Sequence, residues 1–346
     1  MTGRERIDGA VNFRQTDRVP AALLSGGSWA LYNNGLNIQK AILLEPEDVA
    51  EKIFSISGRA GVDIVWAAPS FGNILIKTMG GEIKFRGKGP PDVTKPLIHD
   101  VRDLERIDLK KSFSDPFLRK MKEITRLVAA MARSEYAVGA SMWGPFTMCG
   151  LLYGAENLMR DLYKNAAAVY AILDWTTRLY LEFVDCFFID CGVNFIAMGD
   201  PFASGDMISR RHFENFVIPS YGAVYTRLRK KNVTTCLHIC GNIENRLDLI
   251  PQTGVSVVSI DYKVDIKKAR KTFGKRTALA GNLNPVDVIK DGKPEDIIAA
   301  GRRCIADAGE GCGFILMPGC DIPPATPFEN VRAMIEAAEK HRFDRS

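Results

Sequence analysis

A histidine and a cysteine, with a single residue between them, occur at the end of a short apolar stretch, 234–239. Side chains two positions apart on an extended segment point to the same face, so His238 and Cys240 can act together. A second cysteine, Cys320, follows another apolar stretch much later in the chain. One imidazole and two thiolates are typical zinc ligands, and three protein ligands leave a position open for a substrate. These residues predict a zinc site that can do chemistry, although single His and Cys residues in strands are often only core residues.

Two carboxylates follow similar apolar stretches. Asp261 comes directly after 255–260, where it is a fourth zinc ligand, an acceptor that orients another ligand, or a cap for the next helix. Asp200 stands before a proline shortly after 194–198, where it is either catalytic or a turn residue. We take both as candidate catalytic groups, and Asp261 also as a candidate metal ligand.

Candidate substrate-binding residues occupy comparable places. Trp143 follows the stretch 136–142, Asn282 follows 277–280, and Tyr32 belongs to a group of aromatic residues near predicted strand ends. Aromatic side chains at strand ends either line a pocket or simply pack. We predict that Trp143, Tyr32 and Asn282 contact the substrate.

Eight apolar stretches alternate with longer amphipathic segments, and this alternation decides the expected fold. Nearly continuous apolar strands separated by helices are typical of a parallel sheet covered by helices. Eight such units predict an α/β protein with a single (β/α)8 TIM barrel over residues 1–346, in which the carboxyl ends of the strands share one mouth. An open doubly wound sheet is the alternative, but no G-x-G-x-x-G fingerprint follows the first strand. The predicted strands are 19–24, 62–67, 136–142, 194–198, 234–239, 255–260, 277–280 and 314–317, and the main helices are 46–59, 101–108, 116–132, 155–188, 211–231 and 327–340.

One region departs from the alternation. Residues 74–77 and 82–85 flank Met79-Gly80-Gly81, which is a turn signal. We therefore expect a β-hairpin and a proline-containing loop, inserted over 71–99 after the second strand.

Composition narrows the class of protein. The chain is 46% hydrophobic and 25% charged with a net charge of +5, which is ordinary for a globular protein. We expect no nucleic-acid partner, because no long basic run is present, and no membrane partner, because no apolar run reaches about 18 residues. The N-terminus lacks the apolar core of a signal peptide, and the eight cysteines are expected to be free thiols, so we expect a cytoplasmic protein.

Several motifs give the chain a family resemblance. It resembles the uroporphyrinogen decarboxylase superfamily, and within it the corrinoid-dependent methyltransferases that act with zinc, such as the methylcobalamin:coenzyme M methyltransferases. The similarity runs over nearly the whole chain. The segments that carry it are 16–20 (TDRVP), 143–147 (WGPFT), 199–204 (GDPFAS), 237–242 (LHICGN), 280–282 (AGN) and 317–338 (MPGCDIPPATPFENVRAMIEAA).

The resemblance implies a zinc-dependent methyltransferase on a TIM barrel, with zinc held by His238, Cys240 and Cys320. Cobalamin-independent methionine synthases are similar at their metal, which adds Asp261 as a fourth ligand. The implied reaction moves a methyl group between a corrinoid, such as methylcobalamin, and a small molecule at zinc. That molecule is either a thiol acceptor or a methoxy or methylamine donor. No D-x-H-x-x-G motif of a cobalamin-binding domain occurs, so the corrinoid is expected on a separate corrinoid protein.

Two other functions remain as alternatives. The first is a decarboxylase like the one that names the superfamily, but that enzyme binds its polyanionic substrate with an arginine-rich segment, and residues 21–34 contain no arginine here. The second is a non-catalytic barrel or sensor that zinc only stabilises, which predicts four protein ligands and no open position.

Overall fold

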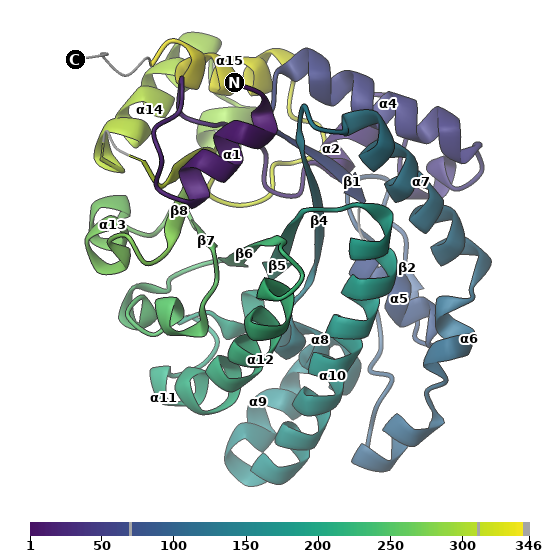
Figure 1. Cartoon of the computed structure of the whole chain (residues 1–346). Coiled ribbons are helices and arrows are strands. Elements are labelled where there is room, and N and C mark those ends of the chain that lie inside the picture. The colour runs from purple at the N-terminus through teal and green to yellow at the C-terminus, as the bar shows by residue number, and fades with distance from the viewer. Residues whose placement is uncertain (69–70, 310–311, 342–346) are drawn as a thin grey trace.

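The computed structural model describes residues 1–68, 71–309 and 312–341. Within these ranges, seven parallel strands form one curled sheet in the order β1-β4-β5-β6-β7-β8-β9, and helices cover its outside (Figure 1). This is a TIM-barrel-like α/β fold, and the seven strands expected from 62–67 onward are confirmed. The strands of the sheet are β1 Ile64–Ala68, β4 Ala137–Trp143, β5 Phe195–Gly199, β6 Thr234–Ile239, β7 Val257–Ile260, β8 Ala278–Leu283 and β9 Phe314–Pro318.

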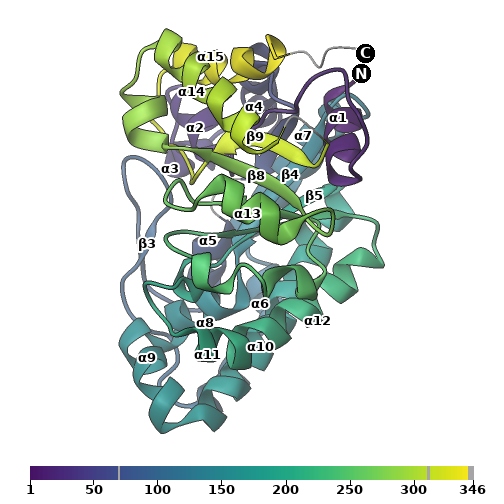
Figure 2. The same ribbon diagram turned by 90° about the vertical axis from the view of Figure 1, so that its left-hand side faces the viewer.

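The helices are divided between two ends of the molecule. Helices α8 to α12 gather at one end, and α14 and α15 lie at the other, as both views show (Figures 1 and 2). The α-helices are α1 Gly3–Val11, α2 Gly27–Tyr32, α3 Ile38–Ala41, α4 Pro46–Ala60, α5 Phe71–Thr78, α6 Leu109–Phe113, α7 Pro116–Ala132, α8 Pro145–Tyr153, α9 Ala155–Lys164, α10 Ala166–Phe187, α11 Arg210–His212, α12 Ile218–Arg229, α13 Ile266–Phe273, α14 Pro294–Asp307 and α15 Phe328–Glu339.

Local signals explain where several helices begin and end. Helix α7 begins at a proline, and the side chain of Asp115 accepts a hydrogen bond from the N–H of Phe117. The long helix expected over 155–188 is divided between α9 and α10, because Asn165 ends the first helix and caps the second. The helix expected over 211–231 is also divided, since a π-helical turn, Phe213–Val217, comes directly before α12.

The segment 19–24 closes the gap between β9 and β1 without becoming a regular strand. Ala21 forms an isolated parallel bridge with Leu316, and the N–H of Ala22 donates to the Leu316 carbonyl at 3.0 Å. On the other side, the Ala21 carbonyl accepts from the N–H of Asp63 at 2.9 Å. The ladder stays short because Pro20 has no N–H and because the Asp63 carboxylate takes the Ala21 N–H at 2.8 Å.

The hairpin expected within 71–99 is wrong in its first strand. Residues 74–77 belong to helix α5, whose residues 71–76 are all buried. A short apolar run of this kind fits a buried helix as well as a strand, so periodicity did not distinguish them. A small antiparallel pair does form further on, between β2 (Ile83–Lys84) and β3 (Asp92–Val93).

The strands are apolar on both faces, and this places the polar side chains at their ends. Every described residue of β5, β7 and β9 is buried except Gly199 at the end of β5. Because the strands are parallel and in register, with Gly199 opposite His238, their carboxyl ends meet at one mouth. Among the described helices, none is both long enough and apolar enough to cross a membrane.

Candidate metal centre at the mouth of the barrel

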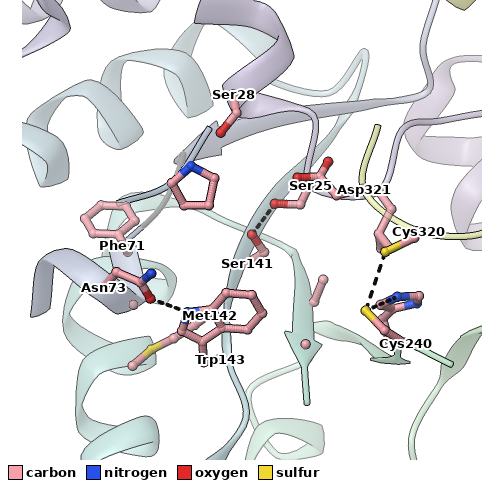
Figure 3. A pocket seen from close by; sticks show the side chains of 16 residues that line it. Ser25, Ser28, Phe71, Asn73, Ser141, Met142, Trp143, Cys240, Cys320 and Asp321 are labelled. Atoms are coloured by element: carbon pink, nitrogen blue, oxygen red, sulfur yellow. Dashed lines mark hydrogen bonds between the residues drawn. The ribbon is translucent and has the colours of Figure 1, made fainter. Parts of the chain in front are cut away.

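Three metal-binding side chains meet at the mouth. His238 is the last but one residue of β6, Cys240 follows that strand, and Cys320 comes shortly after β9. The Cys240 Sγ lies 3.3 Å from His238 Nε2 and 3.4 Å from the Cys320 Sγ (Figure 3). One ligand atom from each residue lies within 4.8 Å of those of the other two. One nitrogen and two sulfurs at this separation form a donor set that suits zinc.

The imidazole of His238 is held by the neighbouring strand. His238 is buried, and its Nδ1 lies 3.1 Å from the Ser259 carbonyl oxygen and 3.2 Å from the Ser259 Oγ. Donation from Nδ1–H to that carbonyl leaves Nε2 as the lone-pair nitrogen, on the side of the cysteines. A carbonyl partner on the second nitrogen is the usual way that proteins orient a metal-binding histidine. Ser259 lies directly opposite His238 in the ladder, which sequence reasoning did not identify.

The two thiols differ in acidity because they share a proton. A hydrogen bond from Cys240 lowers the pKa of Cys320, and the same contact, with burial, raises the pKa of Cys240. Cys320 is therefore the thiol that ionises first. Two sulfurs in such contact are stabilised further when a cation replaces the shared proton, because metal ligands bind as thiolates.

Asp261 is close to the three residues but is occupied by the backbone. Its Oδ2 accepts from the N–H of Gly241 at 2.8 Å, and its Oδ1 accepts from the N–H of Lys263 at 2.9 Å. Gly241 has φ of +83°, a conformation that favours glycine, and it forms the turn directly after Cys240. Among the described residues, the ligand cluster comprises His238, Cys240 and Cys320 without Asp261. Its position suits an acceptor that fixes the turn carrying Cys240.

Asp200 lies below the mouth. It is fully buried and accepts from the N–H of Thr147 at 2.7 Å, from its Oγ1 at 2.5 Å, and from the N–H of Phe146 at 3.3 Å. These N–H groups belong to the first turn of α8, whose N-cap Gly144 has no side chain, so Asp200 caps that helix from another strand end. Burial raises the pKa of Asp200 to about 6, and the hydrogen bonds from Thr147 oppose this rise.

A cavity of about 150 Å³ opens beside the three ligands. Figure 3 shows Cys240 and Cys320 on one side of it and Phe71 and Asn73 on the other. Trp143 lines this cavity, and its indole N–H donates to the Asn73 side-chain oxygen. The described lining residues are Leu24, Ser25, Ser28, Phe71, Gly72, Asn73, Pro90, Ser141, Met142, Trp143, Ala197, Gly199, His238, Cys240, Cys320 and Asp321.

The other two predicted substrate contacts lie elsewhere. Tyr32 lines a separate small pocket, where the Lys88 ammonium lies 5.1 Å from the centre of its ring. Asn282 donates to the backbone carbonyls of Asp261 and Val264 at 3.1 and 2.9 Å, so it holds the loop after β7. Neither residue is among those that line the cavity beside the cysteines.

Five polar residues of the cavity were missed, namely Ser25, Ser28, Asn73, Ser141 and Asp321. Ser25 and Ser141 are joined by a hydrogen bond of 2.6 Å, and Ser25 has a positive φ of 54°. Asn73 orients Trp143. Asp321 is exposed toward the cavity, and removal from bulk water and the nearby Cys320 thiolate raise its pKa well above its ordinary value. Of these residues, only Asp321 could have been predicted from a motif, because it directly follows Cys320.

The fold and these residues define a TIM-barrel-like α/β protein with a candidate metal centre at the carboxyl ends of its strands. Residues 2–341 match the family model named uroporphyrinogen decarboxylase (URO-D), and the chain belongs to this family.

Known relatives extend this assignment. The methylcobamide:CoM methyltransferase MtbA of Methanosarcina mazei is 29% identical, with 99% of each chain covered. The uroporphyrinogen decarboxylase of Geobacter metallireducens is 26% identical over 94% of this chain and 96% of that one. A solved structure described as a methyltransferase from Methanosarcina mazei has the same fold, with a TM-score of 0.87, 24% identity, and coverage of 98% of this chain and 99% of that one.

Proposed function

We propose that the chain is a zinc-dependent methyltransferase. It moves a methyl group between a corrinoid, carried by a separate corrinoid protein, and a small molecule bound at zinc. The small molecule is either a thiol acceptor or a methoxy or methylamine donor. The observation that carries the proposal is the meeting of His238, Cys240 and Cys320 beside a cavity.

The residues fit zinc by the chemistry of their donors. Nε2 of His238 is left with its lone pair by the contact of Nδ1 with Ser259, and the two thiols lie within one coordination sphere of it. With Asp261 engaged by two backbone N–H groups, the protein supplies three ligands, and we assign the remaining position to the substrate. Catalytic zinc sites commonly have this composition.

Bound zinc would supply a Lewis acid that lowers the pKa of a substrate thiol or polarises the leaving heteroatom. The protein residues do the rest. Asp261 and Gly241 fix the turn that carries Cys240, and Ser259 fixes the ring of His238. Trp143, held by Asn73, forms an apolar wall that keeps water from the reacting atoms. In the thiol direction, the sulfur lone pair forms the new S–C bond while the electrons of the Co–C bond stay on cobalt.

The decarboxylase alternative is less favoured. The segment 21–34, which contains helix α2 and part of the cavity wall, contains no arginine for a polyanionic substrate. A decarboxylase also leaves the cluster of His238, Cys240 and Cys320 without a role. The methylcobamide:CoM methyltransferase MtbA of Methanosarcina mazei is moreover similar over 99% of its length, at 29% identity.

The direct test uses one cysteine at the site and one away from it. Cys320→Ala is expected to remove bound zinc and methyl transfer from methylcobalamin, because it deletes the ligand that ionises first. The control is Cys186→Ala on helix α10, a half-buried cysteine outside the cluster. The control should keep about one zinc per chain by metal analysis. Zinc that remains fully bound in Cys320→Ala would overturn the proposed site.

A further inference from the structure

The cavity beside the metal ligands is lined by one carboxyl group, and His238, a proposed metal ligand, is the one basic side chain among its described lining residues. Of the sixteen described residues that line it, none is lysine or arginine, and Asp321 is the one carboxylate. The other polar groups of the wall are neutral serines and Asn73. With Cys240 and Cys320 as thiolates and His238 neutral, a divalent ion is balanced by its own ligands. The carboxyl group of Asp321 then has no lysine or arginine partner among the described residues that line the cavity.

Asp321 differs from the other acids near the mouth because it lines the cavity, although it also accepts a backbone hydrogen bond from Ile322. Both oxygens of Asp261 accept backbone N–H groups, and Asp200 accepts from the first turn of α8. No described lysine or arginine forms an ion pair with Asp321, and its side chain is exposed toward the cavity (Figure 3). A carboxylate that lines a cavity is stabilised by a positive partner, and the described lining residues include no lysine or arginine to provide one.

The opposite wall suits the same kind of partner. Trp143 and Phe71 line the cavity across from the two cysteines (Figure 3). The faces of aromatic rings attract organic cations, and indole does so most strongly. Serine hydroxyls and the Asn73 amide add acceptors for ammonium hydrogens. Lys88 lies over Tyr32 in a separate pocket that shares Ser28, so its charge is engaged outside this cavity.

We propose that the small molecule bound beside the metal carries a positively charged group, such as an ammonium, which pairs with Asp321. A sulfonate or carboxylate in the same place is disfavoured because it would face Asp321 without a counter-ion. This inference rests on the proposed function and adds the chemical class of its second substrate. It separates this chain from the relatives whose printed name includes CoM, a thiol with a sulfonate group.

The experiment compares three thiols of equal length that differ in charge: 2-aminoethanethiol, 2-mercaptoethanol and 2-mercaptoethanesulfonate. Their dissociation constants are measured on the full chain with Co²⁺ in place of zinc, from the change in the visible absorption of the metal. Wild type should bind the ammonium thiol at least about tenfold more tightly than the sulfonate thiol. In Asp321→Asn this preference should shrink to about threefold or less. The three thiols differ in their own pKa values, but this difference is the same for wild type and Asp321→Asn and therefore cancels when the two proteins are compared.

A matched control removes one carboxylate elsewhere. Asp174 lies on helix α10, is mostly exposed, and pairs with Arg178. Asp174→Asn should therefore keep the wild-type preference. A preference for the sulfonate thiol in wild type, or an unchanged preference in Asp321→Asn, would overturn the inference.

A parallel measurement separates the inference from the function it rests on. Methyl transfer from methylcobalamin to each thiol is followed by loss of the methylcobalamin spectrum. If the thiols bind or are methylated but the sulfonate thiol is preferred to the ammonium thiol, the inference is overturned and the proposed methyltransferase function stands. If none of the thiols changes the Co²⁺ spectrum, the open metal position fails, and the proposed function and the inference fall together.

Discussion

At the scale of residues, the site depends on which polar atoms are already occupied by the protein itself. His238 gives one ring nitrogen to Ser259, Asp261 gives both oxygens to backbone N–H groups, and Asp200 caps a helix. The sulfurs of Cys240 and Cys320 contact each other and His238, and the Cys320 sulfur also accepts from the backbone N–H of Asp321. Occupied groups position the site, and the atoms with spare capacity are left for the metal.

Asp200 offers a pH test of its structural role. The pKa of its buried carboxyl is raised from 3.8 to about 6, so between these values the folded state holds a proton that the unfolded state releases. This contribution to stability is fully present below the unfolded pKa and is lost as the pH rises through the folded pKa. Its full size is about 3 kcal/mol.

The measurement compares wild type with Asp200→Asn by denaturant unfolding at about pH 4.5 and about pH 7.5. The free energy of unfolding of wild type relative to the variant should fall by about 2 kcal/mol between these values, since part of the titration lies at lower pH. A difference that does not change with pH would show that Asp200 titrates normally in the folded protein.

At the scale of elements, the turns after β6 and β7 hold each other. Asp261 fixes Gly241 directly after Cys240, and Asn282 near the end of β8 fixes the carbonyls of Asp261 and Val264. Three consecutive strand ends are therefore linked by hydrogen bonds. We therefore expect a change in one of these turns to shift Cys240, a proposed metal ligand, on another.

This linkage predicts an intermediate effect for Asp261. Asp261→Ala should keep stoichiometric zinc but weaken it by about 10–100-fold in competition with a chelator, because the turn that carries Cys240 loses its acceptor. Asp261→Asn, which keeps an acceptor oxygen, should lose less. The control is Asp265→Asn, which alters only the cap of α13. Complete loss of zinc in both Asp261 variants would make Asp261 a direct ligand.

The sequence predicted best those elements whose hydrophobic pattern fits only one type of secondary structure. Seven buried strands and helix α7 were placed within a few residues, and the order of strand ends was enough to bring His238, Cys240 and Cys320 together. Helix α5 was mistaken for a strand because a fully buried segment has no polar face to reveal its period.

The remaining parts of the site depend on partners distant in the chain. Nothing local shows that Asp200 caps α8, or that Asn282 holds the loop after β7. Ser25 bonds to Ser141, and Asn73 bonds to Trp143, only because the folded sheet brings these distant segments together. Motifs locate ligands, whereas the cavity wall follows from the tertiary fold.

At the scale of the whole molecule, ion pairs as well as strand pairing hold the barrel closed. Asp63, almost fully buried, accepts from Arg18 at 2.7 Å, from Arg6 at 3.1 Å, and from the N–H of Ala21. Arg6 lies on α1, and Arg18 belongs to the family segment 16–20. One carboxylate thus joins the first helix, the closing segment and the start of β1.

Removal of this carboxylate should weaken the whole fold. Asp63→Ala is expected to lower the free energy of unfolding by about 3–5 kcal/mol, because it leaves the largely buried Arg18 without a carboxylate and the Ala21 N–H without an acceptor, while Arg6 keeps Asp17. The control is Asp8→Ala, which removes an exposed pair with Arg14 and should cost less than about 1 kcal/mol. Equal losses in the two variants by denaturant unfolding would show that Asp63 does not close the barrel.

The central claim is an open zinc position at the mouth, and X-ray absorption at the zinc edge tests it most directly. The protein alone should show two sulfur ligands, one imidazole nitrogen and one light atom from solvent, in keeping with the cluster of His238, Cys240 and Cys320. Addition of 2-aminoethanethiol should replace the light atom with a third sulfur. A zinc sphere of four protein ligands that stays unchanged with the thiol would contradict the account and favour a barrel that zinc only stabilises.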